Sequence, residues 1–295
     1  MAKQSYSLTY CNGKLVTGPD RGNFYTTLAL VVCPEIVFLI VTIPDLFDVI
    51  GLGTIAILIA NLYLWLLCLA SLIYTSLTDP GIIPRGPEMP EDPSNPWKNL
   101  PPSSQNIMLA GEEYELKWCN TCNIYRPPRA THCGTCNNCV DRFDHHCPWT
   151  GNCIGRRNYQ SFLIFVYSVM FNCLYVGGFG IACLALIGIR DDKDFTGLFE
   201  EGRNIVTGLL VIYCALAECS VAILGGLHCL LVFKSQTTNE HIKGTYTNRK
   251  NPFNEGCLKN FCYLWCAPGY GRFTTLQDSN AESNGKLTYE LSQRS

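Results

Sequence analysis

Residues 119–162 read CNTCNIYRPPRATHCGTCNNCVDRFDHHCPWTGNCIGRRNYQSF. Seven cysteines and three histidines lie within the first 35 residues of this stretch, whereas the whole chain of 295 residues has only five histidines. Two cysteines separated by two residues, such as Cys119 and Cys122, can bring both thiolates to one tetrahedral metal ion. The stretch therefore predicts zinc binding, in a region that metal rather than a large apolar core holds together.

The candidate ligands outnumber what two zinc ions need. Two closed tetrahedral sites use eight ligands, and ten are present. The consecutive residues Asp144-His145-His146-Cys147 supply an acid, two imidazoles and a thiol. We infer one histidine that binds metal, one that acts as a base, and a free nucleophilic Cys147. Two alternatives are a buried structural role for Cys147 and redox-active dithiols in place of metal ligands.

Four long apolar segments flank this region. Only 16% of the residues are charged, against about 25% in a typical soluble domain. Residues 51–76 and 159–189 carry no charge and exceed the ~20 residues that span a bilayer. Residues 205–233 contain one glutamate and one histidine, and residues 25–50 have a proline and a glutamate near their middle. We expect an all-α integral membrane protein with four transmembrane helices; buried helices of a soluble core are the alternative.

Basic residues are distributed unevenly among the polar segments. The segment 190–204 has three Lys or Arg residues against five acids, and the other nineteen basic residues lie in 1–24, in 77–158 and after residue 233. The positive-inside rule then places both termini and 77–158 in the cytosol, and 190–204 in the lumen. We expect a C-terminal motif region at 234–273, a disordered tail at 274–295, and no cleaved signal peptide.

A cytosolic location changes how the cysteines are interpreted. The cytosol is reducing, so paired cysteines favour metal over structural disulfides there. The net charge of -2 and the lack of a dense basic stripe argue against a nucleic-acid partner. We expect no internal repeat.

A free cysteine held at a membrane surface suggests thioester chemistry on a lipid. The thiolate is the nucleophile, and a free cysteine with a pKa of ~8.5 needs activation near neutral pH. His145 can take the proton, and Asp144 can fix the tautomer and stabilise the imidazolium. Attack on an acyl-CoA would give acyl-Cys147, and a thiolate of a protein substrate would then accept the acyl group. The acyl chain should stay in apolar surroundings between the helices, because each buried CH2 contributes ~0.8 kcal/mol.

These residues resemble the DHHC family of protein S-acyltransferases (palmitoyltransferases). The resemblance covers roughly residues 20–270 and extends beyond the Asp-His-His-Cys tetrad to Asp79-Pro80-Gly81, Thr237-Thr238-Asn239-Glu240 and the stretch from Asn251 to Asn260. It implies a cysteine-rich zinc domain between the second and third helices. It also implies protein-cysteine S-palmitoyltransferase activity, with palmitoyl-CoA as acyl donor.

The resemblance implies a role for each site residue. It implies two structural zinc sites, one made by Cys119, Cys122, His132 and Cys139, and the other by Cys133, Cys136, His146 and Cys153. Catalysis would fall to Cys147, His145 and Asp144. Thr237 would help to orient Asp144, and Asn260 would support the local fold.

A finer resemblance is to the branch that acylates Ras-type GTPases at the Golgi or endoplasmic reticulum with a small accessory subunit. The runs at 237–244 and 262–268 carry it, and the chain departs from it at Phe261, where that branch often has a cysteine. The implied partners are proteins with membrane-proximal cysteines, acyl-CoA, membrane lipids and the accessory subunit. The plasma membrane is the alternative location.

Three further cysteines lie in the C-terminal region, and juxtamembrane cysteines are often lipidated. We expect lipidation at Cys257, Cys262 and Cys266. The runner-up functions are a non-enzymatic membrane zinc protein, either a scaffold or a ubiquitin-ligase adaptor, and a membrane thiol oxidoreductase. A scaffold would show no acyl-CoA turnover, and an oxidoreductase would show a cycling disulfide without zinc.

Overall fold

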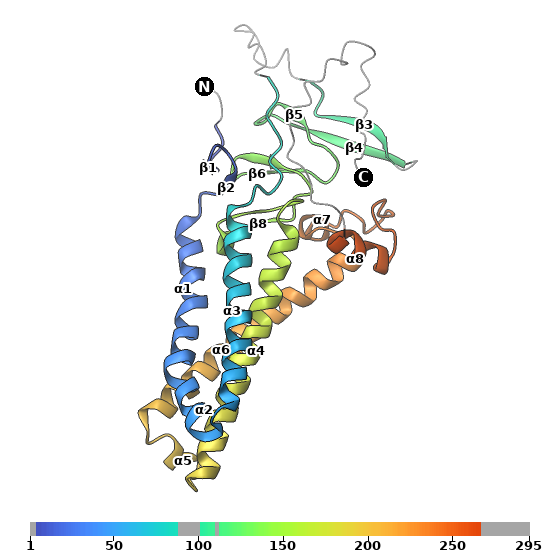
Figure 1. Ribbon diagram of the computed structural model, residues 1–295. Coiled ribbons are helices and arrows are strands. Elements are labelled where there is room, and N and C mark those ends of the chain that lie inside the picture. Colours follow the sequence, from blue (N-terminus) through green and yellow to red (C-terminus); the bar gives the residue numbers. More distant parts are fainter. Residues whose placement is uncertain (1–3, 88–100, 110–111, 267–295) are drawn as a thin grey trace. The chain divides into compact units, whose positions relative to one another are not determined.

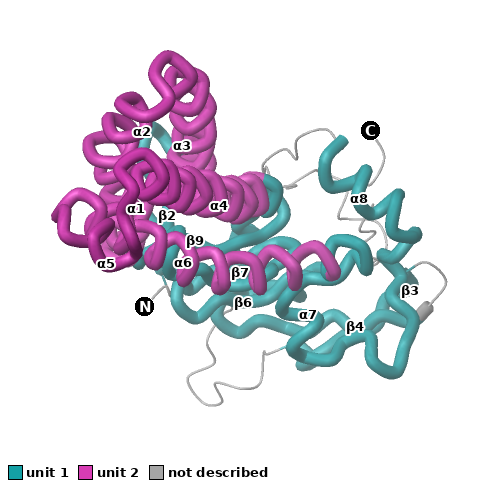
Figure 2. The backbone as a smooth tube through the Cα atoms, turned by 90° about the horizontal axis from the view of Figure 1, so that it is seen from below, with its two compact units in different colours: residues 1–20, 76–160, 231–295 teal, residues 21–75, 161–230 magenta. Residues whose placement is uncertain are grey.

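The computed structural model describes residues 4–87, 101–109 and 112–266. The expected disordered tail at 274–295 lies outside these residues. The chain divides into two compact units, which Figure 2 shows in different colours. A helical unit contains residues 21–75 and 161–230, and a cysteine-rich unit contains residues 1–20, 76–160 and 231–295.

Four helical segments are long and apolar enough to cross a membrane. They are Arg21–Ile50, Gly53–Leu77, Tyr159–Arg190 and Gly202–Phe233. The first consists of α1 (Arg21–Val37), a π-helical turn (Phe38–Thr42) and α2 (Ile43–Ile50), whereas the others are the single helices α3, α4 and α6. The short helix α5 (Phe195–Leu198) lies between α4 and α6 (Figure 1). The prediction of four such helices, with the cysteine-rich region between the second and third, is confirmed.

The break in the first segment follows from Pro34. Proline has no N–H, so the carbonyl of Leu30 loses its usual helical donor. The hydroxyl of Tyr213, on α6, donates to that carbonyl at 2.7 Å. The π-helical turn from Phe38 follows one turn later, where the backbone resumes hydrogen bonding in a wider register. A tyrosine on a neighbouring helix therefore compensates for the proline in this span.

Most residues of these apolar helices are not buried. Only 17–28% of the residues in each most apolar window are buried. A helix in a soluble core would bury most of that surface, so the pattern is that of a multi-pass membrane protein. Polar contacts also join the helices: Thr42 bonds Thr207 at 3.3 Å, and Thr75 donates to Ser161 at 2.9 Å.

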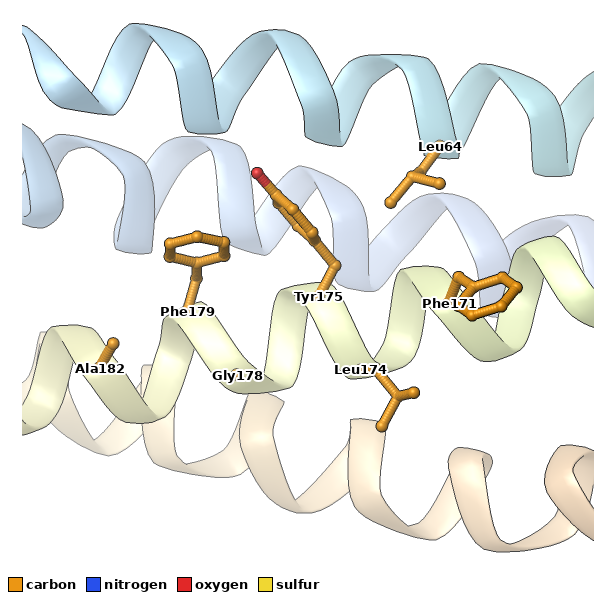
Figure 3. A pocket seen from close by; sticks show the side chains of 7 residues that line it. All are labelled: Leu64, Phe171, Leu174, Tyr175, Gly178, Phe179 and Ala182. Atoms are coloured by element: carbon orange, nitrogen blue, oxygen red, sulfur yellow. The ribbon is translucent and has the colours of Figure 1, made fainter.

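An apolar groove of about 510 Å³ lies along α3 and α4 (Figure 3). It is lined by Leu64, Phe171, Leu174, Tyr175, Gly178, Phe179 and Ala182. The Tyr175 hydroxyl donates to the carbonyl of Ile57 at 3.0 Å, so its polar end is already paired. The groove therefore offers hydrocarbon-like surface to a lipid tail or an acyl chain.

The cysteine-rich unit is built from short antiparallel hairpins, which the sequence did not predict. The strands are β1 (Leu8–Tyr10), β2 (Leu15–Thr17), β3 (Ser104–Leu109), β4 (Glu112–Cys119), β5 (Ile124–Tyr125), β6 (Thr131–Cys133), β7 (Asn138–Val140), β8 (His145–Cys147) and β9 (Asn152–Ile154). They pair as β1-β2, β3-β4-β5, β6-β7 and β8-β9. Two helices follow, α7 (Thr238–Ile242) and α8 (Cys257–Cys266).

The β4-β5 and β6-β7 hairpins turn at the paired cysteines. Asn123 follows Cys122 with φ of 52°, and Asn137 follows Cys136 with φ of 53°. Asparagine tolerates this left-handed conformation better than most residues, so each pair can reverse the chain tightly. The apolar clusters beside them are small and consist largely of cysteines, with Ile83 and Ala130 in one and Val140 and Phe143 in the other. Small clusters of this kind are typical of regions that a bound metal ion crosslinks.

Candidate active site and metal centres

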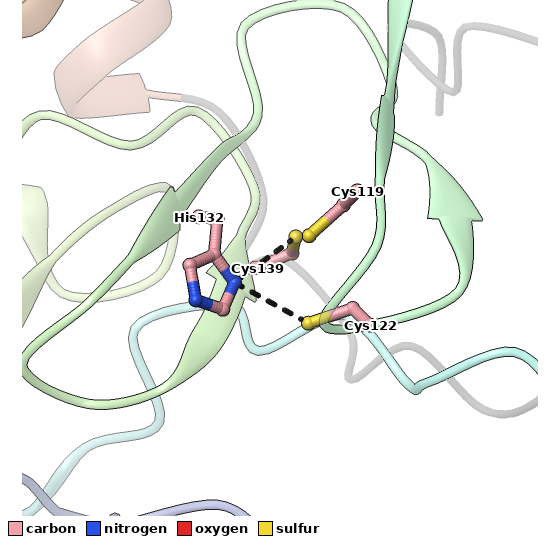
Figure 4. Close-up of side chains that lie close together, drawn as sticks. All are labelled: Cys119, Cys122, His132 and Cys139. Carbon is pink, nitrogen blue, oxygen red and sulfur yellow. Dashed lines mark hydrogen bonds between the residues drawn. The ribbon is translucent and has the colours of Figure 1, made fainter. Parts of the chain in front are cut away.

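The first Cys3His cluster consists of Cys119, Cys122, His132 and Cys139 (Figure 4). The ligand atoms of these residues all lie within 4.8 Å of one another. His132 Nδ1 is 3.4 Å from Cys122 Sγ and 3.8 Å from Cys139 Sγ. Register explains part of this, because His132 on β6 lies directly opposite Cys139 on β7.

The second Cys3His cluster consists of Cys133, Cys136, His146 and Cys153. His146 Nδ1 lies 3.4 Å from Cys136 Sγ and 3.5 Å from Cys153 Sγ, and the two sulfurs are 3.5 Å apart. Here His146 on β8 lies opposite Cys153 on β9. Both clusters are therefore built in the same way, from a Cys-x-x-Cys turn and one histidine–cysteine cross-strand pair.

The likeness of the two clusters reveals a repeat in the sequence. Each ligand of the second cluster lies 14 residues after its counterpart in the first: 119 to 133, 122 to 136, 132 to 146 and 139 to 153. Both follow the pattern C-x2-C-x9-H-x6-C. The expectation of no internal repeat is thus wrong at this scale, and the spacing itself was the signal that could have shown it.

The donor sets fit zinc. Three sulfurs and one imidazole nitrogen form a usual structural zinc set, and Zn–S bonds of 2.3 Å place tetrahedral ligands about 3.8 Å apart. The sulfur and nitrogen separations of 3.4–3.8 Å in both clusters are close to that spacing. Hydrogen bonds with Cys122 and Cys139 hold the pKa of Cys119 well below its usual range, while hydrogen bonds with Cys119 and Cys122 raise the pKa of Cys139. A divalent cation would neutralise the charge that these crowded sulfurs share.

Strand geometry separates the remaining residues of the tetrad from the metal ligands. Successive side chains of a strand point to opposite faces. On β8, His146 faces the second cluster, and His145 and Cys147 therefore share the other face. His145 Nδ1–H donates to Asp144 Oδ2 at 2.7 Å. An acid, an imidazole and a thiol thus meet outside both clusters.

The electrostatics of this group favour a thiolate. Burial opposes protonation of His145, but the hydrogen bonds with Asp144 and Cys147 outweigh it and raise its pKa to about 9. Burial alone would raise the pKa of the Cys147 thiol, yet the hydrogen bond and charge of His145 bring that pKa below its usual value. The thiolate is the form of cysteine that attacks an acyl carbon, and a neighbouring imidazolium stabilises this form.

Asp144 is held by the backbone of the C-terminal region. Its carboxylate is buried and accepts from Thr238 N at 2.9 Å, and its carbonyl accepts from Asn239 N at 3.0 Å. These residues begin α7, so the helix N-terminus also stabilises the negative charge of the carboxylate.

The sequence was compared with known proteins. The family model described as DHHC palmitoyltransferase matches residues 112–245. A Dictyostelium discoideum protein named putative ZDHHC-type palmitoyltransferase 1 is 38% identical over 92% of this chain and 57% of its own length. Palmitoyltransferase ZDHHC9 of Danio rerio is 36% identical over 97% of this chain and 78% of its own. The human ZDHHC9 is 37% identical over 88% and 73%.

The chain belongs to the DHHC palmitoyltransferase family. The resemblance read from the tetrad and its surroundings is therefore confirmed. The chain spans little more than half the length of the first two relatives that it matches, 57% and 56%.

Thr237 of this DHHC protein caps α7. Its hydroxyl accepts from Glu240 N at 3.2 Å, and Glu240 Oε2 accepts from Thr237 N at 2.9 Å, which completes a capping box. The backbone N–H that reaches the Asp144 carboxylate belongs to the next residue, Thr238. Thr237 therefore stabilises the start of α7, and the backbone there holds Asp144.

A buried ion pair, whose role the sequence did not reveal, fixes the same helix. Arg129 Nε and Nη2 donate to the two oxygens of Glu240 at 2.8 and 2.7 Å, and both side chains are only 5% exposed. The guanidinium also lies 4.5 Å above the ring of Phe253. The Thr-x-x-Glu spacing that signals a capping box was the available clue to Glu240, but nothing local in the sequence indicated Arg129 as its partner.

Asn260 lies at the junction of two C-terminal elements. Its amide donates to the carbonyl of Phe233, the last residue of α6, at 2.7 Å and to Asn254 Oδ1 at 2.8 Å. Its Oδ1 accepts from Glu255 N at 3.1 Å. Asn260 therefore ties α8 and the preceding loop to the end of α6. Three exposed cysteines lie on α8, namely Cys257, Cys262 and Cys266.

Proposed function

We propose that this chain is a protein-cysteine S-palmitoyltransferase that carries the acyl group on Cys147. The observation that supports this most strongly is the placement of His145 and Cys147 on the face of β8 opposite the metal cluster, with Asp144 hydrogen-bonded to His145. A cysteine engaged in a closed zinc site would be inert. This one stays outside both clusters.

The first step is acyl transfer to the enzyme. The Cys147 thiolate attacks the carbonyl carbon of palmitoyl-CoA, the new C–S bond forms, and the C–S bond to CoA breaks. The leaving CoA thiolate takes the proton from the His145 imidazolium, so the products are acyl-Cys147 and CoA. Asp144 keeps the ring in one tautomer by accepting from Nδ1–H and stabilises its charged form.

The second step reverses these roles. His145 removes the proton from a substrate cysteine, whose thiolate attacks the acyl-Cys147 carbonyl and displaces the Cys147 thiolate. One thioester replaces another in each step, so no ATP or redox cofactor is needed. We place the acyl chain in the apolar environment of the helices, for which the groove along α3 and α4 supplies hydrocarbon-like surface.

The two Cys3His clusters are the proposed zinc sites. Cys119, Cys122, His132 and Cys139 would hold one ion, and Cys133, Cys136, His146 and Cys153 the other. Zinc bound there would crosslink the hairpins and supply no catalytic chemistry, because each set is closed.

The environment of the enzyme follows from the same proposal. We place both termini and the cysteine-rich unit in the cytosol, by loop charge, and the protein in Golgi or endoplasmic reticulum membranes. Its substrates would be proteins with membrane-proximal cysteines, among them Ras-type GTPases. The enzyme would act together with a small accessory subunit. The runs at 237–244 and 262–268, which carry the finer resemblance, support this choice. Lipidation at Cys257, Cys262 and Cys266 is consistent with their exposure.

Acyl transfer between proteins tests the proposal. Purified enzyme given labelled palmitoyl-CoA and a membrane-tethered cysteine peptide should transfer label that hydroxylamine releases. Cys147→Ser should abolish labelling of the peptide, whereas Cys219→Ser, at an exposed cysteine outside the site, should leave it unchanged. Undiminished transfer by the Cys147 variant would refute the proposal that Cys147 carries the acyl group. No transfer by the unaltered protein would favour the alternative of a non-enzymatic scaffold.

A further inference from the structure

Asp20 lies just before α1 and contacts a ligand of the second Cys3His cluster. Its Oδ2 accepts from His146 Nε2–H at 2.7 Å. The other ring nitrogen of His146, Nδ1, faces Cys136 Sγ and Cys153 Sγ at 3.4 and 3.5 Å. The imidazole is therefore held at both ends, by sulfurs on one side and a carboxylate on the other.

The first Cys3His cluster lacks this arrangement. His132 also points Nδ1 at its cysteines, 3.4 and 3.8 Å away. Among residues 4–87, 101–109 and 112–266, nothing hydrogen-bonds to its Nε2. The two clusters thus have the same ligand spacing but differ in what supports the histidine. Of the two, the second cluster, whose His146 lies on β8 with His145 and Cys147, has the carboxylate.

Contacts along the N-terminal segment place Asp20 in this position. Tyr6 N donates to the carbonyl of Cys136 at 3.0 Å, and Asn138 donates to Ser5 Oγ at 2.7 Å. The buried amide of Asn152, on β9, donates to the carbonyl of Val16 at 3.1 Å. Residues 5–16 are thereby fastened to both hairpins that supply the second cluster.

Gly18 brings the chain still closer. A Cβ at this position would lie 2.5 Å from the carbonyl oxygen of Gly151, in the turn between β8 and β9. The backbone therefore passes against that turn at a distance that only glycine permits. Two residues later, the Asp20 carboxylate meets His146.

We propose that Asp20 is a positioning residue for the second zinc centre, an inference that rests on the proposed zinc sites. A carboxylate that accepts from a ligating imidazole fixes its tautomer and orientation and raises its basicity toward the metal. Here the proton is held on Nε2, which leaves the Nδ1 lone pair for the ion. Because His146 lies between His145 and Cys147, the same contact fixes the strand that carries the reactive pair.

Zinc release from the full-length protein in detergent tests the proposal without depending on acyl transfer. The wild-type protein should give up two equivalents to a chromogenic chelator. In Asp20→Asn and Asp20→Ala, one equivalent should leave about 10–100-fold faster, since loss of such a partner typically weakens metal affinity by that factor. The other equivalent, from the first cluster, should leave at the wild-type rate.

Two control variants sharpen the result. Asp20→Glu keeps a carboxylate and should restore most of the slow release. Glu115→Gln alters a half-exposed carboxylate of the same unit and should change neither equivalent. Wild-type release of both ions from the Asp20 variants would overturn the proposal, and so would loss of both ions together, which would indicate general unfolding. The outcome stands apart from the Cys147→Ser test, which measures transfer and not metal.

Discussion

At the scale of single residues, strand alternation turns the side chains of His145 and His146 to opposite faces of β8. His146 faces the sulfurs of the second Cys3His cluster, whereas His145 faces Asp144. The two side chains can therefore be distinguished by separate measurements of zinc content and reaction rate.

His145→Ala should slow formation of the acyl-enzyme by about 10²–10⁴-fold, the usual contribution of a positioned acid–base group. Its zinc content should remain at two ions per chain. His146→Ala should instead lose one zinc equivalent, because it removes a ligand. Rapid-quench labelling together with metal analysis of the same samples checks both. A lost zinc in the His145 variant would mean that the two histidines are assigned the wrong way round.

The sequence could supply the residue types of this site but not all of their partners. The sequence has ten candidate ligands, whereas two closed zinc sites use eight. The surplus predicted one free thiol and one free imidazole, which the Asp-His-His-Cys tetrad can supply. Asp20 and Arg129 could not be found in that way, because their contacts with His146 and Glu240 join residues more than a hundred positions apart.

At the scale of elements, α7 depends on a buried ion pair. Glu240→Ala leaves the Arg129 guanidinium buried without its carboxylate, so we expect a loss of about 3–5 kcal/mol in unfolding free energy. Chemical denaturation monitored in the detergent-solubilised protein measures this loss.

The exposed pair Lys259–Glu255 provides the matched control. Removing Lys259 should change stability by less than about 1 kcal/mol. A double variant with leucine at both Arg129 and Glu240 should recover much of the loss, because no unpaired charge remains buried. Equal effects of the buried and exposed changes would contradict the account.

Zinc removal should affect the two units differently. The cysteine-rich unit has small apolar clusters made largely of cysteines, so a strong chelator should unfold its hairpins. The four apolar helices should persist, because their stability comes from lipid and helix packing. Limited proteolysis should then cut within residues 112–160 while the far-UV helical signal is retained. Protection of this region after complete zinc loss would contradict a metal-held fold.

The elements differed in how well the sequence could predict them. The four apolar helices were predictable because each contains an apolar run long enough to span a bilayer. Most of the hairpins were not, because all the described strands except β3 and β4 have only two or three residues, too few to show an alternating pattern. Tight turns at Asn123 and Asn137 set the register of two of them, and the proposed zinc ions would hold the strands together.

At the scale of the whole molecule, loop charge predicts the topology. A glycosylation acceptor inserted in the segment 190–204 should be modified in cells, because the positive-inside rule places that segment in the lumen. Acceptors in 1–24 or beyond residue 233 should stay unmodified. A shift in gel mobility that a glycosidase reverses reports each outcome, and modification of the terminal acceptors would reverse the proposed orientation.

The central claim concerns one sulfur that no metal holds and that accepts an acyl group. Intact-mass analysis of the purified protein after incubation with palmitoyl-CoA, with zinc counted on the same sample, tests it most directly. We expect the incubation to add one hydroxylamine-labile palmitoyl group to a chain that holds two zinc ions, and to add none to Cys147→Ser, which should keep both zinc ions. A Cys147→Ser protein that still gains the acyl group, or that loses a zinc ion, would contradict the account.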